Sequence, residues 1–251
     1  MIPVIRIDDA QEDRQTTAKI LREACMNVGF FYLEGHGIPH DLLEKVFLQS
    51  QKLFHLSTSA KQALKDATMS RGYTAMEEET LDPKSQTKGD TKEGFYIGPE
   101  ISKDDPRFNP AKLSGPNVWP TEQNIKGELS AQDCQDFRTV MDEYFSQMTA
   151  LSFRVTQLLA LALELNPHYF DPYFQEPMGF IRLLHYAKET SNPENGVFAC
   201  GAHSDYGMIT LLLTDHQPGL QIHYKGDWVD APPRPNAFVV NLGKYGSETS
   251  C

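Results

Sequence analysis

The feature that most constrains the fold is one long apolar stripe in the middle of the chain. Between about Ala131 and Leu165, large apolar side chains recur every three or four residues, which is the spacing of one face of an α-helix. At about 1.5 Å per residue such a helix spans on the order of 50 Å, and Asn166-Pro167 ends it. We expect the stripe to be core and to back an entire sheet. Its members are Phe137, Met141, Tyr144, Met148, Leu151, Val155, Leu158 and Ala162.

Shorter patterns before and after this helix predict the other elements. In the first third, alternating or apolar segments predict strands, and wider apolar spacing predicts helices. The last third contains short strands separated by turn residues, which is typical of a jelly roll or barrel. The expected strands are 3–7, 30–33, 178–186, 208–214, 220–224, 227–230 and 236–242, with 200–202 as an extended lead-in, and the expected helices are 11–28, 41–55 and 57–65.

The segment from Met69 to about Asn124 has a different composition. Glycines, prolines and charged residues dominate it, and only Phe95-Tyr96-Ile97 is strand-like. The sequence therefore predicts a long, loop-rich crossing. Such a crossing is usually functional or packed by its own side chains.

Composition excludes several classes of partner. The 251 residues carry a net charge of −11 with no basic cluster, which argues against a nucleic-acid or anionic-membrane partner. No apolar run approaches the ~20 residues of a membrane helix, and the N-terminus lacks a signal-peptide pattern. Four widely spaced cysteines without a C-x-x-C motif predict reduced thiols and a cytoplasmic protein. They are Cys25, Cys134, Cys200 and Cys251.

His203 and Asp205 are the candidate metal ligands. On an extended backbone, residues two apart project to the same side, so this pair could occupy adjacent positions around a divalent metal. A second histidine would complete a three-ligand face that leaves the opposite positions open. The spacing alone also fits a hydrogen-bonded pair at the end of a strand, and both interpretations remain open at this point.

Several motifs extend over nearly the whole chain. They are Ile2-Pro3-Val4-Ile5, Gly29-Phe30-Phe31-Tyr32, Gly35-His36-Gly37-Ile38, Arg71-Gly72-Tyr73, Lys92-Glu93-Gly94-Phe95, Gly115-Pro116-Asn117-Val118-Trp119-Pro120, Gly201 to Gly207, Pro218 to Val229 and Pro235 to Gly243. Together they resemble the isopenicillin-N-synthase-like branch of the 2-oxoglutarate- and Fe(II)-dependent dioxygenases. A cupin-type sugar- or metal-binding module is disfavoured by the N-terminal motifs.

The resemblance implies an α+β fold with a mostly β core. This core is a double-stranded β-helix (jelly roll), incomplete at the C-terminus, with a helical N-terminal domain and one long backing helix. We expect a non-haem dioxygenase N-terminal domain over 1–125. The backing helix and a connector then occupy 126–176, and the Fe(II)/2-oxoglutarate core occupies 177–251.

The resemblance also implies the chemistry. Family members couple oxidative decarboxylation of 2-oxoglutarate to hydroxylation or desaturation of a small organic metabolite, using Fe(II) and O2, with ascorbate as a reductant. His203 and Asp205 match the metal-ligand positions, and Tyr186 matches a tyrosine that contacts the co-substrate carboxylate; it could equally be a core tyrosine. Leu184 stands where many relatives carry Asn. No further catalytic residue is assigned, and a monomer is expected.

The sequence departs from the family pattern at its C-terminal end. Relatives supply a second histidine ligand and then an Arg-x-Ser that anchors 2-oxoglutarate, but no histidine follows His223 and no Arg-x-Ser follows Asp205. His185, His216 and His223 are not expected to replace the missing ligand.

The alternative to an enzyme is therefore a catalytically inactive, truncated isoform, a jelly-roll remnant with weak metal binding at most. In that case exposed strand edges are expected at 208–213 and 237–242. His36, His40 and His55 are expected to be turn or surface residues.

Overall fold

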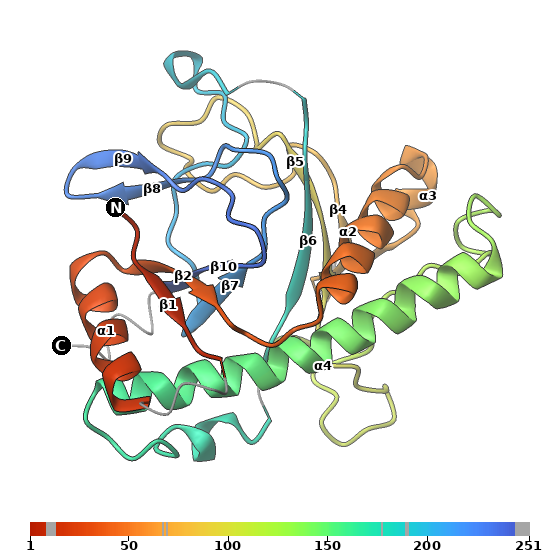
Figure 1. The fold of residues 1–251 in the computed structure, drawn as a ribbon. Helices are drawn as coiled ribbons and strands as arrows, with labels where there is room; N and C mark the ends of the chain where they lie inside the picture. The colour runs from red at the N-terminus through yellow and green to blue at the C-terminus, as the bar shows by residue number, and fades with distance from the viewer. Residues whose placement is uncertain (9–13, 67, 69, 177, 189–190, 244–251) are drawn as a thin grey trace. The chain divides into compact units, whose positions relative to one another are not determined.

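The computed structural model describes residues 1–8, 14–66, 68, 70–176, 178–188 and 191–243 (Figure 1). Helices and mixed sheets together form an α+β fold, and no helix in these ranges is long and apolar enough to cross a membrane. The elements are β1 (Val4–Arg6), α1 (Arg14–Asn27), β2 (Phe30–Glu34), α2 (His40–Phe54), α3 (Thr58–Gln62), β3 (Lys65–Asp66), β4 (Arg71–Thr74), β5 (Lys92–Ile97), α4 (Ala131–Ala162), β6 (Ile181–Tyr186), β7 (Ile209–Leu212), β8 (Gln221–Tyr224), β9 (Asp227–Asp230) and β10 (Phe238–Leu242), with 3₁₀ turns at Pro110–Lys112, Asp171–Phe174 and Pro193–Asn195.

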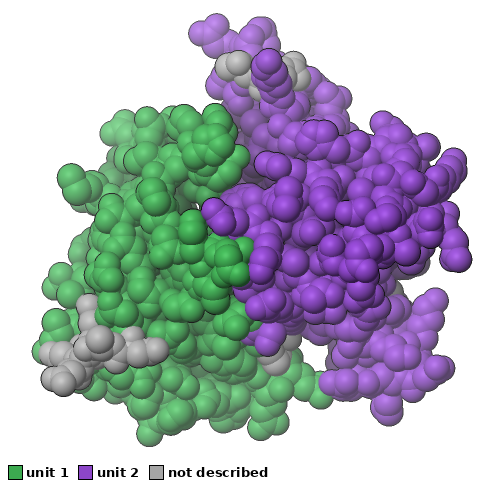
Figure 2. All heavy atoms as spheres, turned by 45° about the vertical axis from the view of Figure 1, so that its right-hand side comes forward, with its two compact units in different colours: residues 1–41, 147–176, 204–251 green, residues 42–146, 177–203 purple. Residues whose placement is uncertain are grey.

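The chain divides into two compact units, each built from segments that are distant in sequence (Figure 2). Unit 1 comprises residues 1–41, 147–176 and 204–251, and unit 2 comprises residues 42–146 and 177–203. The long helix α4 contributes its first half to unit 2 and its second half to unit 1.

Unit 1 contains a four-stranded sheet in the order β1-β2-β10-β7, so strands from the two ends of the chain pair side by side (Figure 1). β1 is parallel to β2, and β10 is antiparallel to both of its neighbours. The prediction that 237–242 forms an exposed edge is wrong, because β2 pairs with β10 on the side opposite β7. Within the described residues β1 and β7 are the two edge strands of this sheet, and the side chains of β7 are half-buried.

Unit 2 contains an antiparallel sheet in the order β3-β4-β5-β6. The prediction of an almost strand-free crossing over 69–124 is therefore wrong at β4 and at the first half of β5. The physical reason is that the charged residues of these strands are buried and paired. Arg71, for example, is buried and donates a 2.7 Å hydrogen bond from Nη2 to the carbonyl of Leu113.

The long helix and its apolar stripe are confirmed. Every predicted stripe residue of α4 is buried except Met148, which is half-buried. In unit 2 the ring of Phe137 meets Phe95 of β5 edge to face at 5.8 Å between centroids, so α4 packs on that sheet.

The other helices also form where they were expected, and the β8–β9 hairpin turns at Lys225-Gly226. α3 is shorter than predicted and is capped by Ser57, whose Oγ accepts the Ala60 N–H. The predicted start of the first helix, at residues 11–13, lies outside the described residues.

Candidate metal centre

His203 lies in an irregular segment of unit 2, not on a strand as the alternation argument assumed. Its exposed imidazole is oriented by the backbone two residues earlier, because Nδ1 is 2.9 Å from the carbonyl oxygen of Gly201. A carbonyl can only accept, so Nδ1 carries the proton and the ring lone pair is on Nε2. The thiol of Cys200 is 3.9 Å from the same Nδ1. This is the tautomer that leaves Nε2 as a metal donor.

Asp205 belongs to unit 1 and is half-buried. Asn241 of β10 donates from Nδ2 to its Oδ2 at 2.9 Å. Gly243 follows β10 and donates its N–H to the carbonyl of Met208 at 3.0 Å, which fixes the backbone just after Asp205 to the end of that strand. The side-chain amide of Asn241 therefore orients the carboxylate of Asp205.

The boundary between the two units falls between His203 and Ser204. Each candidate ligand is therefore described within its own unit. Covalent geometry alone keeps the two Cα atoms within about 7 Å of each other, since they are two residues apart in an unbroken chain.

Tyr186 ends β6 opposite Lys92 of β5, and 44% of its surface is exposed. The pKa of its phenol is raised, first by desolvation and then by the neighbouring Cys200 thiol, although Arg182 acts in the opposite direction. The hydroxyl therefore stays protonated at neutral pH and is a hydrogen-bond donor. This side chain is not the core tyrosine of the alternative interpretation.

The other histidines of the core region have different surroundings. His185 contacts Oε1 of Glu93 through Nδ1 at 2.8 Å and stacks on Phe54, His216 is an exposed loop residue, and His223 lies against the ring of Trp228. Within the described part of the chain, no group of three His, Cys, Asp or Glu side chains could hold a metal. His203 and Asp205 thus supply an imidazole and a carboxylate, the donor types of a 2-His-1-carboxylate metal site, and the described residues offer no third such group beside them.

His36 was expected to be a turn or surface residue, and that expectation is wrong. The ring is buried in unit 1, where Nδ1 accepts the Ile38 N–H at 3.1 Å and Nε2 lies 3.3 Å from the carbonyl of Asn236. Arg154 of α4 donates to the His36 carbonyl at 2.8 Å. Both ring nitrogens are engaged, so His36 is a structural residue. His40 and His55 are exposed, as expected.

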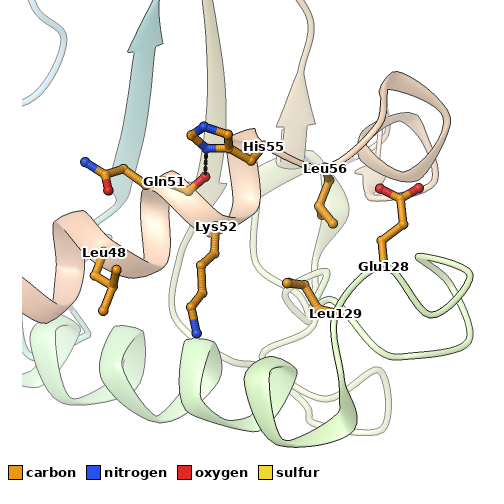
Figure 3. A pocket seen from close by; sticks show the side chains of 7 residues that line it. All are labelled: Leu48, Gln51, Lys52, His55, Leu56, Glu128 and Leu129. Atoms are coloured by element: carbon orange, nitrogen blue, oxygen red, sulfur yellow. Dashed lines mark hydrogen bonds between the residues drawn. The ribbon is translucent and has the colours of Figure 1, made fainter.

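The described pocket in Figure 3 is a separate feature of unit 2. It lies between α2 and the segment that precedes α4, and the imidazole of His55 faces the carbonyl of Gln51 at 2.6 Å. No predicted site residue lines it. The lining residues are Leu48, Gln51, Lys52, His55, Leu56, Glu128 and Leu129.

Sequence reasoning missed Asn241 as a contact of the candidate ligand Asp205. A signal was present, because Asn241 is a polar residue inside the apolar strand Phe238-Val239-Val240-Asn241-Leu242. A polar side chain in such a strand needs a partner, and here the partner is the carboxylate of Asp205.

Two family models match the chain. The model described as non-haem dioxygenase in morphine synthesis N-terminal matches residues 2–122, and that of the 2OG-Fe(II) oxygenase superfamily matches residues 179–247. Members of this family use Fe(II), 2-oxoglutarate, O2 and small-molecule substrates.

Individual relatives agree with these matches. Clavatol oxidase of Penicillium crustosum is 34% identical over 242 residues, which cover 91% of this chain and 70% of that protein. A 2-oxoglutarate-dependent dioxygenase of Monascus ruber is 34% identical, with 96% and 74% covered. A 2-oxoglutarate-Fe(II) type oxidoreductase of Emericella nidulans is 35% identical, and the chain covers 63% of it. The chain thus spans about two thirds to three quarters of the length of these relatives.

Solved structures show the same similarity. A full-length Neurospora crassa protein, solved in complex with alpha-KG and thymine, superposes with a TM-score of 0.81 at 30% identity, covering 98% of this chain and 75% of that one. The C-terminal truncated form of the same Neurospora crassa protein superposes with a TM-score of 0.76. The chain belongs to the 2OG-Fe(II) oxygenase superfamily, in its isopenicillin-N-synthase-like branch.

Proposed function

We propose that this chain carries part of the active site of an Fe(II)- and 2-oxoglutarate-dependent oxygenase that hydroxylates or desaturates a small organic metabolite. The observation that carries the proposal is the pair of oriented donors. The contact of Nδ1 with Gly201 leaves Nε2 of His203 as a donor, and Asn241 orients the carboxylate of Asp205. Hydrogen bonds of this kind to the second atom of a ligand are usual around protein metal sites.

The roles of the chain's own residues follow from this chemistry. Nε2 of His203 and a carboxylate oxygen of Asp205 would hold Fe(II), which together with 2-oxoglutarate and O2 would supply the oxidising chemistry. The hydroxyl of Tyr186, which its raised pKa keeps protonated, would donate a hydrogen bond to a carboxylate of 2-oxoglutarate. Ascorbate would serve as a reductant that restores Fe(II).

The architecture proposed for this function is a double-stranded β-helix core with a helical N-terminal domain. The division into 1–125, 126–176 and 177–251 stays a prediction, and so does the monomeric state. The two family matches, at 2–122 and 179–247, support the first and the last of these three ranges.

A second interpretation is that a polypeptide of these 251 residues is inactive. It is favoured by the absence of a histidine after His223 and of an Arg-x-Ser after Asp205. Two protein donors hold an ion more weakly than three, and a co-substrate without its arginine loses a bidentate partner. We therefore propose the oxygenase function for the lineage, with weak metal binding and little or no turnover for the 251 residues by themselves.

The test is calorimetric titration of Mn(II), with and without 2-oxoglutarate, into the wild-type chain and His203→Ala. We expect weak binding that falls by about tenfold or more in the variant. His216→Ala removes an exposed loop histidine and is the matched control, with unchanged affinity expected. Equal affinity in all three proteins would refute the metal site.

A decarboxylation assay separates the two interpretations. If the 251-residue chain released CO2 from 2-oxoglutarate at family-like rates in an Fe(II)-dependent manner, the inactive interpretation would be wrong.

A further inference from the structure

Asp90 is a fully buried carboxylate that precedes β5 in unit 2, with 0% of its surface exposed. Its backbone is fixed on both sides, since its N–H donates to the carbonyl of Glu79 at 2.8 Å and its carbonyl accepts the Glu77 N–H at 3.0 Å. The side chain therefore projects from a backbone that has little freedom to shift.

The two carboxylate oxygens of Asp90 have different partners. Oδ1 accepts the side-chain amide of Gln86 at 2.8 Å and the backbone N–H of Gly201 at 2.9 Å. Oδ2 pairs with the ammonium group of Lys92, whose side chain is 2% exposed. Buried carboxylates with this number of donors are held firmly in place.

The residues next to Asp90 contact the same distant segment. The N–H of Thr91 donates to the carbonyl of Phe198 at 3.0 Å, and Nζ of Lys92 is 3.5 Å from the sulfur of Cys200. Residues 90–92 thus fix residues 198–201, which lead directly to His203.

Gly201 connects these contacts to the imidazole. A Cβ on this residue would overlap the side-chain oxygen of Gln86 and lie 2.9 Å from the backbone nitrogen of Asp82, so no side chain fits. Its N–H is held by Asp90, and its carbonyl accepts the Nδ1 proton of His203 at 2.9 Å. Asp90 is therefore two hydrogen bonds away from the imidazole.

We propose that Asp90 is a positioning residue for His203. By fixing Gly201, it sets the direction of the carbonyl that selects the Nδ1-protonated tautomer and orients Nε2. Asp90 acts through Gly201 and is not itself proposed as a ligand. The inference rests on the proposed function only in its assignment of His203 as a metal ligand.

Three variants of the 251-residue chain test this role. Asp90→Ala removes the acceptor of the Gly201 N–H, and Asp90→Asn keeps an oxygen in its place while it abolishes the charge. Glu79→Gln is the matched control, because Glu79 pairs with Lys92 at 3.0 Å and with Arg182 at 2.5 Å. It weakens the same ionic cluster without removing the acceptor of Gly201. Urea unfolding establishes that each variant is folded.

The first measurement is Mn(II) affinity. We expect Asp90→Ala to bind Mn(II) about tenfold more weakly or worse, and Asp90→Asn and Glu79→Gln to stay within about threefold of wild type. If Asp90→Ala bound as tightly as wild type, or if Glu79→Gln lost as much affinity, the positioning role would be overturned.

The second measurement does not depend on a metal. Nitrogen NMR of the His203 ring reports its tautomer, and hydrogen exchange reports protection of the Gly201 amide. We expect an Nδ1-protonated ring and a protected amide in wild type and Asp90→Asn, and a tautomer mixture with a fast-exchanging amide in Asp90→Ala. An unchanged tautomer in Asp90→Ala would overturn the inference. If wild type bound no Mn(II), the proposed function would fail, and these spectra would still decide the role of Asp90.

Discussion

The ammonium group of Lys61 lies 2.7 Å from Oε2 of Glu93, and the two side chains are only 11% and 3% exposed. The same oxygen accepts the hydroxyl of Tyr73 at 2.6 Å, and Oε1 is 2.8 Å from Nδ1 of His185. One carboxylate on β5 therefore gathers side chains from α3, β4 and β6. This explains how a charged residue occupies the middle of the unit 2 sheet.

Glu93→Gln should destabilise the protein by about 3 kcal/mol, because it leaves the ammonium of Lys61 buried without its counter-charge. Lys61→Met should cost less, since Tyr73 and His185 still donate to the carboxylate. The double variant should cost less than the sum of the two. Urea unfolding measures all three.

The control is Lys88→Met, which removes a partly exposed pair with Glu77 and should cost about 1 kcal/mol or less. If the losses of unfolding free energy in the two single variants summed to that of the double variant, Glu93 and Lys61 would not be energetically coupled.

The pH dependence of stability should report the same carboxylate. Burial alone would raise the pKa of Glu93, but hydrogen bonds from Lys61, Tyr73 and His185 outweigh it and lower that pKa below the ordinary 4.5. A lowered folded-state pKa gives stability that is complete above the unfolded-state value and is lost as the pH falls through the folded-state value. The stability difference between wild type and Glu93→Gln should therefore shrink from about pH 6 to about pH 3. A constant difference in unfolding free energy would contradict this assignment.

The parts of the fold that the sequence predicted well are those specified by local periodicity. The stripe from Phe137 to Ala162 repeats within each turn, so α4 could be predicted from neighbouring residues alone. β4 and the first half of β5 could not, because Arg71, Lys92 and Glu93 look like solvent-exposed residues until their buried partners are known. Those partners, Leu113, Asp90 and Lys61 among them, come from outside the strands themselves.

The candidate site shows the same division. A short motif is enough to propose His203 and Asp205 as candidate ligands, whereas the hydrogen bonds of these two side chains could not be predicted from it. Asp90 and Gly201 are separated by 111 positions, and Asp205 and Asn241 by 36. Local pattern cannot reveal contacts at such separations. The local pattern also predicted the wrong backbone conformation for His203 and Asp205, because it assumed the alternation of a strand where the chain is irregular.

Gly72→Ala should be strongly destabilising. Gly72 has a φ of +70°, and a Cβ there would overlap the carbonyl oxygen of Leu64. That carbonyl cannot move away freely, because it accepts the Tyr73 N–H at 3.0 Å. We expect a loss of about 3 kcal/mol or more from strain and overpacking together.

Gly127→Ala is the matched control for the Gly72 experiment. Its φ is +75° and nothing lies within 4 Å of the new Cβ, so backbone strain of about 1–2 kcal/mol should be the whole cost. Thermal or urea unfolding compares the two variants. Equal losses of unfolding free energy would show that the Leu64 carbonyl moves aside at little cost, so that its contact with the new Cβ does not matter.

Asn241→Ala should weaken metal binding without unfolding unit 1. Asn241 donates to Oδ2 of Asp205 at 2.9 Å, and loss of a hydrogen bond to a metal-binding carboxylate lowers affinity by about tenfold or more. The backbone pairing of β10 with β2 and β7 does not involve this side chain, so the free energy of unfolding should fall by only about 1 kcal/mol. Mn(II) calorimetry and urea unfolding measure the two effects.

Gln221→Ala is the control, because it removes a comparable amide-to-carboxylate contact, with Asp230 at 2.9 Å, from the exposed hairpin. If both variants left Mn(II) affinity unchanged, Asn241 would not orient a metal ligand, and the assignment of Asp205 would lose its structural support.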